Sequence, residues 1–533
     1  MSAAGAMLLA GCSAELTDGP DNPVKAPDDA PFYLTFELAA PTASANSQAH
    51  APATRAGETR AEVVKREDES TINSIIAYMV DAEGAYANRI AGVAYGDNVV
   101  IGTYDTGAKT TTVTLNMGLN TLYSRKHKYR VYVLANVPET SDFTSGAIGT
   151  DISNISRTVV QFNSGVFAAT PTILPTELDS RGIPLSTAPA DAAKIQVWLE
   201  ENADYSDADN AYVVKADTGK KDADGNPNSK ETSGTLTLTP LYARFDFVRA
   251  DSKSDFVYSI DYKEGDGSET SSTEVMVEFK QARVVGAAKE VYTVLRSGSQ
   301  AQVAAGQTFI SPLTALTTST SGISGNIAIK HSEAGSTVEG KDNPAIYVPE
   351  YIPVLGSATM LNYNKVTYLE LDAILKVDNS CTASATVKSL IGGSDKTKAL
   401  AYYDDGKYQS VLMPFDATKM TDVYDATTNP NGKWRKLTWD ATLGGYKVTY
   451  RHAIRNSSGP SEEWKDDDGV VYPMEYGVVR NSLYQIGIAS VSALPHPWTT
   501  TTPVESDKKD INIKILPPTK WFYHRGGFEL NFE

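Results

Sequence analysis

The chain has 533 residues, with 48 Lys and Arg against 65 Asp and Glu, which gives a formal net charge of −17 at pH 7. A chain of this length is expected to form two or three domains, each with its own core. The acidic balance argues against nucleic acid as a partner, because phosphates need a basic surface. With 2 cysteines, a disulfide framework or a four-cysteine metal site is excluded.

A short apolar run, residues 6–9, leads into Ala10, Gly11 and Cys12. Small residues between an apolar run and a cysteine are typical of bacterial lipoprotein signals, in which the thiol receives the lipid. No Lys or Arg precedes the run, although such a signal has a basic start. The alternative is a chance cysteine after an apolar segment. We expect export and lipidation at Cys12, and no stretch long enough for a transmembrane helix.

The first predicted strand covers residues 32–38. Residues 14–31 before it are acidic and rich in proline, which predicts a solvated tether. Within the strand, polar residues alternate with four large apolar ones, a pattern that predicts one buried face. The predicted buried residues are Phe32, Leu34, Phe36 and Leu38.

A long segment rich in Ala, Ser and Thr follows, residues 41–69, and it contains Arg55, Arg60 and Arg66. Structureless segments of this length are uncommon inside compact domains and are either functional or disordered. Proteases cut readily in such segments. An Arg-specific cut here would free the whole chain before it, including the first strand. The alternative is that these arginines only add solubility.

Strand patterns separated by turn residues recur along the rest of the chain, and they predict an all-β protein built of β-sandwiches. Residues 70–79 and 186–194 are ambiguous between helix and strand. The polar stretch 217–233 is the expected domain division. The clearest strand patterns are residues 72–80, 110–115, 129–134, 194–199, 235–239, 243–248, 274–279, 367–377, 446–450 and 483–488.

The end of the chain repeats the pattern of the first strand. Residues 511–515 alternate Ile with polar residues, and Phe528, Leu530 and Phe532 alternate with Glu and Asn. Two strands of matched pattern can occupy the same place in a sandwich, so the last strand could fill the groove of a molecule that has lost its first strand. Burying three or four such side chains contributes on the order of 5–10 kcal/mol. Chance similarity, or pairing of the two strands in one static monomer, are the alternatives.

Several segments together resemble the fimbrillins of Bacteroidales, the type V pilins, and especially their minor-fimbrium shaft subunit. They are the cysteine motif at residues 9–12, the Arg-Ala-Gly loop at 54–57 ahead of 75–80, and residues 241–247, 347–350 and 477–488.

The resemblance implies two tandem transthyretin-like β-sandwich domains in an exported outer-membrane lipoprotein. It further implies that an Arg-specific, trypsin-like protease cuts after Arg55, with Arg60 and Arg66 as alternatives. Polymerisation would follow by exchange of a C-terminal donor strand within residues 521–533. The expected parts are a signal at 1–12, a propeptide at 13–55, sandwich domains at 56–233 and 234–508, and C-terminal strands at 509–533.

Catalytic and metal-binding patterns are not found. No nucleophile elbow, phosphate loop, HExxH or CxxC motif occurs, and the 6 histidines are scattered. Residues 222–228 alternate oxygen ligands, but their glycine falls fourth rather than sixth, so a polar turn is favoured over a calcium loop. We expect no enzyme activity, cofactor or metal, and a buried, inert thiol at Cys381.

The sequence therefore predicts a pilin that forms a surface fimbria and supports adhesion. The resemblance implies as partners further copies of itself, accessory anchor and tip subunits, the processing protease and, through the lipid, the outer membrane. The alternatives are a surface glycan-binding lipoprotein, in which Trp464, Trp498 or Trp521 could stack on sugars, and an anchor or tip subunit of the same fimbria.

Overall fold

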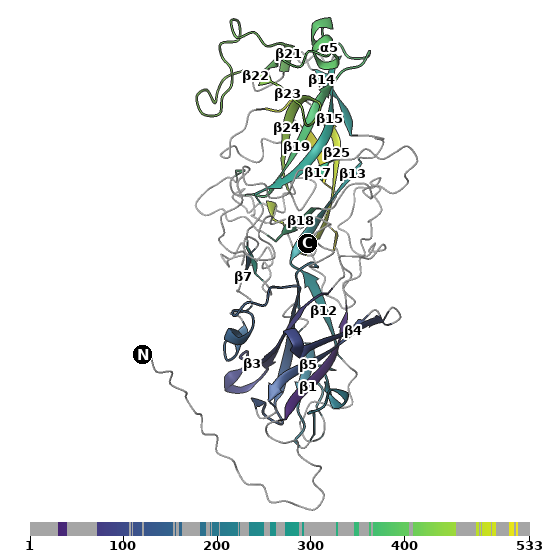
Figure 1. Cartoon of the computed structure of the whole chain (residues 1–533), viewed down its shortest axis with the longest axis vertical. Coiled ribbons are helices and arrows are strands. Elements are labelled where there is room, and N and C mark those ends of the chain that lie inside the picture. Colours follow the sequence, from purple (N-terminus) through teal and green to yellow (C-terminus); the bar gives the residue numbers. More distant parts are fainter. Residues whose placement is uncertain are drawn as a thin grey trace, which may run out of the picture.

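The described part of the chain consists mainly of β-strands, which confirms the all-β prediction (Figure 1). The structure is a computed structural model. It describes residues 30–39, 72–161, 182–223, 234–249, 256–262, 272–292, 327–328, 346–350, 362–454, 476–496, 511–515 and 519–520, with short gaps inside the longer ranges.

The first sheet lies at the lower end of the molecule in Figure 1 and surrounds the first core. Its central path runs β6-β8-β12-β1-β5-β4, and β2 joins it through β6. Its described strands are β1 (Pro31–Ala39), β2 (Ile75–Asp81), β3 (Ile90–Ala94), β4 (Val99–Asp105), β5 (Thr110–Leu119), β6 (Lys128–Ala135), β8 (Leu185–Thr187), β9 (Ile195–Trp198), β10 (Tyr212–Val213), β11 (Lys215–Ala216) and β12 (Thr235–Pro240).

Two further sheets enclose the second core between them. Phe245 and Tyr484 stack in one sheet at 4.7 Å between ring centroids, and Phe279 packs against Tyr450 in the other at 5.4 Å. One sheet holds β13 (Tyr242–Arg249), β18 (Ile346–Pro349), β25 (Ser482–Val491), β26 (Ile511–Ile515) and β27 (Thr519–Lys520). The other holds β14 (Val257–Tyr262), β15 (Ser272–Val285), β17 (Ile327–Ala328), β19 (Tyr368–Lys376), β23 (Trp439–Asp440) and β24 (Gly445–Ala453).

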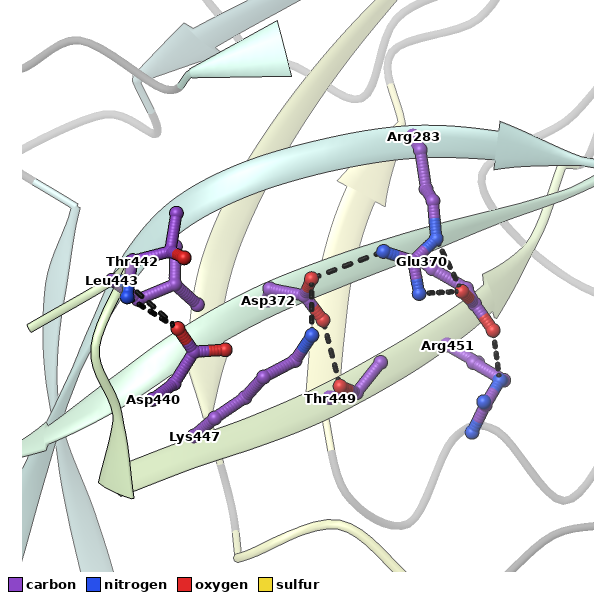
Figure 2. Close-up of polar contacts among 9 residues, drawn as sticks. All are labelled: Arg283, Glu370, Asp372, Asp440, Thr442, Leu443, Lys447, Thr449 and Arg451. Atoms are coloured by element: carbon purple, nitrogen blue, oxygen red, sulfur yellow. Dashed lines mark hydrogen bonds and ion pairs between the residues drawn. The ribbon is translucent and has the colours of Figure 1, made fainter. Parts of the chain in front are cut away.

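The outer face of this last sheet carries a charged network over β15, β19 and β24 (Figure 2). The Glu370 carboxylate lies between two arginines, Arg283 on one side and Arg451 on the other. Asp372 accepts a hydrogen bond of 2.7 Å from Thr449 and pairs with Lys447 at 2.8 Å. Both carboxylates are only 1% exposed, because the partly exposed cations cover them. The network therefore provides cationic partners for the two carboxylates that β19 buries.

The remaining strands form two small sheets, and the short 3-10 turns occur between β2 and β10 along the chain. β7 (Val159–Gln161) pairs with β16 (Glu290–Tyr292). At the top of Figure 1, β20 (Leu400–Asp404), β21 (Gln409–Pro414) and β22 (Trp434–Leu437) form a small sheet beside helix α5 (Ala385–Gly392). The short 3-10 turns are η2 (Gly84–Tyr86), η3 (Gly96–Asn98), η5 (Ser145–Ala147) and η7 (Ala208–Asn210).

The chain passes from the first core to the second between Pro240 and Ala243. Leu241 and Tyr242 belong to the first core, whereas Ala243 belongs to the second. Strand β12 pairs with β1 and β8, so the first sheet includes residues beyond the polar stretch 217–233. The two-domain division at 233 and 234 stays a prediction.

A buried ion pair lies at this junction. The Arg480 Nε atom donates to Glu350 Oε2 at 2.7 Å, and both side chains are 3% exposed. The Glu350 backbone N–H in turn donates to the carbonyl of Leu241. The pair thus connects the last residues of the first core with strands of the second sandwich.

Of the two ambiguous segments, residues 75–79 and 186–187 are strand. Helix α5 was not predicted, although Val387, Leu390 and Ile391 are buried at helical spacing and Ser384 Oγ accepts from the Val387 N–H. Among the described residues, none of the helices is long and apolar enough to span a membrane.

Candidate functional site

Strand β1 is the element that the sequence singled out, and the structure confirms it over Pro31–Ala39. Its side chains alternate strictly between buried and partly exposed along all nine residues. The four predicted core residues are 0–1% exposed. β-Branched and aromatic residues between them favour the extended conformation, and the alternation orients every large apolar side chain toward the first core.

β1 is a central strand, with hydrogen-bonded neighbours on both sides. It runs antiparallel to β5, with Thr35 opposite Thr114 and Glu37 opposite Thr112. On its other side it runs parallel to β10, where Leu34 faces Tyr212, and to β12 near Ala39. We call the space that β1 fills between β5 on one side and β10 and β12 on the other the β1 slot.

The end of the slot around Phe32 is aromatic. The ring of Phe32 lies 4.9 Å from that of Tyr123 and 6.0 Å from that of Tyr205, measured between centroids. Tyr205 packs edge-on against Tyr212 at 5.4 Å. Burial raises the pKa of the Tyr123 hydroxyl and raises that of Tyr212 to about 12. This end of the slot therefore accepts a large aromatic side chain and disfavours charge.

Two backbone hydrogen bonds join β1 to residues that precede and follow β10. The Tyr33 N–H donates to the Tyr205 carbonyl at 2.9 Å, and the Val214 N–H donates to the Thr35 carbonyl at 2.8 Å. A strand that takes the place of β1 must supply an N–H at the position of Tyr33 and a carbonyl at the position of Thr35. A buried backbone group without a hydrogen bond costs free energy.

Two side-chain hydrogen bonds lie on the outer face of β1. Thr35 Oγ1 donates to the Val113 carbonyl at 3.0 Å. Thr112 Oγ1 donates to Glu37 Oε1 at 2.9 Å. The outer face thus offers an acceptor, the Val113 carbonyl, to position 35 and a donor, the Thr112 hydroxyl, to position 37.

β1 is joined to the other described strands only through the long segment after it. The next described residue after Ala39 is Ile72, and residues 40–71 contain the three candidate cleavage arginines. A cut there would leave β1 held by non-covalent contacts alone. Its departure would expose two strand edges and four apolar sites, each contributing roughly 1.5–3 kcal/mol when filled.

Several predicted site residues lie outside the described part of the chain. They are Cys12, Arg55, Arg60, Arg66, Phe528, Leu530 and Phe532. Of the C-terminal region, β26 is described and pairs antiparallel with β25, and β27 pairs with Ser482 and Leu483. The strand predicted at residues 511–515 is confirmed, whereas the donor strand stays a prediction.

The residues that shape the slot around β1 were not singled out in the sequence. Thr112 and Val113 lie in a predicted strand, so the alternation of β5 could have indicated them. Tyr205 lies in a loop and Tyr212 in a two-residue strand, and no periodic signal marks either one.

Other candidate groups have structural roles. His127 bonds to Asp81 at 2.7 Å and His496 to Asp404 at 2.8 Å. Cys381 is buried as predicted, and its burial raises the pKa of the thiol, which disfavours the reactive thiolate. No cluster of His, Cys, Asp or Glu that could hold a metal occurs among the residues described.

Comparison with known proteins gives no family model and no curated protein that matches the chain. Solved structures similar to it include the tip fimbrial protein Mfa3 from Porphyromonas gingivalis with C-terminal truncation, at 10% identity and a TM-score of 0.37 over 92% of this chain and 100% of that one. A candidate cell adhesion protein from Parabacteroides distasonis ATCC 8503 has 12% identity and a TM-score of 0.40, over 92% and 99% of the two chains.

A fimbrial assembly protein from the same Parabacteroides strain has 11% identity and a TM-score of 0.31, over 91% of this chain and 99% of that one. These neighbours are Bacteroidales fimbrial and adhesion proteins, the class that the sequence segments resemble. Their low TM-scores do not carry a function to this chain, so the case for one comes from the geometry of β1.

Proposed function

We propose that this chain is the structural subunit of a bacterial surface fimbria, a pilin that polymerises by strand exchange after its first strand has been removed. The observation that carries the proposal is the position of β1. It is a central strand of the first sheet with four fully buried side chains, yet its only covalent link to the rest of the sheet is an Arg-containing segment.

Cleavage changes the energetics of β1 without altering its contacts. While the chain is intact, β1 is held at a high effective concentration beside its slot. After a cut at Arg55, or alternatively at Arg60 or Arg66, β1 becomes a separate peptide whose departure is favoured by dilution. The slot then offers unpaired backbone on both sides, which is the arrangement that binds an added strand.

The proposed donor is the segment 521–533 of another copy, with Phe528, Leu530 and Phe532 as its apolar side chains. Their alternation matches that of β1. The chain is exported as a lipoprotein precursor that carries lipid on Cys12, and an Arg-specific, trypsin-like protease releases the subunit. The fimbria lies on the cell surface, joined by accessory anchor and tip subunits, and supports adhesion.

Limited digestion of the purified chain with trypsin tests the proposal. We expect a cut within residues 51–66 followed by a ladder of SDS-resistant polymers. A matched control replaces Arg55, Arg60, Lys65 and Arg66 by Gln, and it should remain an uncut monomer. A subunit that is cut in this segment and loses β1, but never forms a ladder, would overturn the proposed function.

A further inference from the structure

We infer the direction and the register in which a donor strand enters the slot. Residues 528–533 of a second copy run in the same direction as β1 and place Phe528 at the position of Phe32, which puts Leu530 at that of Leu34 and Phe532 at that of Phe36. This inference rests on the proposed function.

The order of the apolar sites favours this register over its neighbours. The slot takes Phe, Leu and Phe in succession from its aromatic end. A shift of two residues would force Phe528 into the site of Leu34, where a larger side chain overpacks a filled core, and would leave the Phe32 site to Gly526. A shift of four would leave the Leu34 site to Gly526. Of these three registers in the direction of β1, only the inferred one fills three successive sites with matching side chains.

The apolar pattern reads the same in both directions, so the outer face must decide the direction. Running like β1, the donor places Asn531 at position 35 and Glu533 at position 37. An Asn amide can donate to the Val113 carbonyl, as Thr35 does, and a Glu carboxylate can accept from Thr112, as Glu37 does. Running in reverse, the donor would place Glu529 at position 35, where a carboxylate has no proton to donate to a carbonyl.

Backbone requirements agree with this register. Glu529 takes the place of Tyr33, whose N–H bonds to Tyr205, and Asn531 takes that of Thr35, whose carbonyl bonds to Val214. Because residues 528–533 contain no proline, every position can supply the N–H that the slot needs.

The length that the chain after Lys520 can span indicates that the donor comes from a second copy. β27 ends at Lys520 beside Ser482, at the junction end of the second sandwich. Phe32 lies at the far end of the slot, since β1 runs parallel to β12 toward the junction. From Phe32 to the level of Pro240 the strands span roughly 33 Å, whereas the eight steps from Lys520 to Phe528 span at most roughly 28 Å.

Cysteine pairing between copies tests both direction and register. Each variant carries Cys12→Ser, Asn531→Cys and one cysteine on the outer face of β5. The inferred register places residue 531 opposite Thr114, a shift of two opposite Thr112, a shift of four opposite Thr110, and the reverse direction opposite Asn116. Directly opposed residues are within reach of a disulfide, and diagonal ones are not.

The polymers are formed by trypsin, oxidised, boiled in SDS without reductant and separated by size. We expect a boiling-resistant ladder that collapses with dithiothreitol for Thr114→Cys, and at least a tenfold weaker one for the other three positions. A dominant ladder at position 112, 110 or 116, or crosslinked monomers alone, would overturn the inference while leaving polymerisation intact. Failure to form any polymer before oxidation would instead overturn the proposed function.

Discussion

Leu34 is fully buried in the intact chain, although the proposed cleavage removes it from the mature subunit. Leu34→Ala should therefore lower the free energy of unfolding of the intact chain by about 2–5 kcal/mol, because it leaves a cavity in the core. The same variant should polymerise faster after trypsin, because β1 leaves its slot sooner. Thr35→Ser, which keeps the hydroxyl that bonds to Val113, is the matched control. Urea unfolding and the rate of ladder growth measure the two effects; a destabilised variant whose ladders grow more slowly would contradict the role of β1.

Tyr212 makes the free energy of unfolding depend on pH in the alkaline range. Burial raises its pKa from 10.0 to about 12, so the folded chain keeps the hydroxyl neutral where the unfolded chain ionises it. The resulting stabilisation is complete below pH 10 and is lost as the pH rises through 12. Between pH 8 and pH 11, Tyr212→Phe should lose about 1.4 kcal/mol less unfolding free energy than the unmodified chain. Equal losses in urea titrations of the two proteins would contradict the assignment.

At the residue scale, the sequence predicts what the strand contributes but not what surrounds it. Alternation alone places Phe32 and Leu38 in a core, because a strand has a fixed period of two. The aromatic pocket depends on Tyr123 and Tyr205, which contact Phe32 only through tertiary packing. No periodic pattern in the sequence indicates that these two tyrosines contact Phe32.

Among the elements, β19 depends on the ion network on its outer face. Glu370→Gln would leave Arg283 and Arg451 without their shared carboxylate, and we expect a loss of about 1–3 kcal/mol, less than for a fully buried pair because the arginines remain partly exposed. Lys398→Gln breaks an exposed pair with Asp395 and should leave the urea midpoint unchanged. If both variants unfolded at the same midpoint as the unmodified chain, the network would have no stabilising role.

Long, strongly patterned elements were predictable, and short ones were not. Long runs of alternating or apolar residues, which turns do not have, predict strands at β5, β6, β19 and β25. Helix α5 has only eight residues, and its helical spacing is a weak signal among strands. The central position of β1 could not be predicted, because its parallel partners β10 and β12 are far from it in sequence.

For the molecule as a whole, the proposed assembly is a head-to-tail polymer in which a neighbour's strand completes the first sheet. If the cut follows Arg55, the subunit that polymerises has 533 − 55 = 478 residues and lacks β1. The junction between the two cores contains the buried Arg480–Glu350 pair. A net charge of −17 on each copy opposes association through charge, so the proposed attraction comes from strand edges.

Mass spectrometry of subunits released from the trypsin-formed polymers by boiling tests the central claim most directly. We expect that every polymerised subunit starts between residues 56 and 67, and that washed polymers contain no peptide with residues 31–39. Polymers whose subunits retain that strand, as part of the chain or as a bound fragment, would contradict the claim that a neighbour's strand replaces β1.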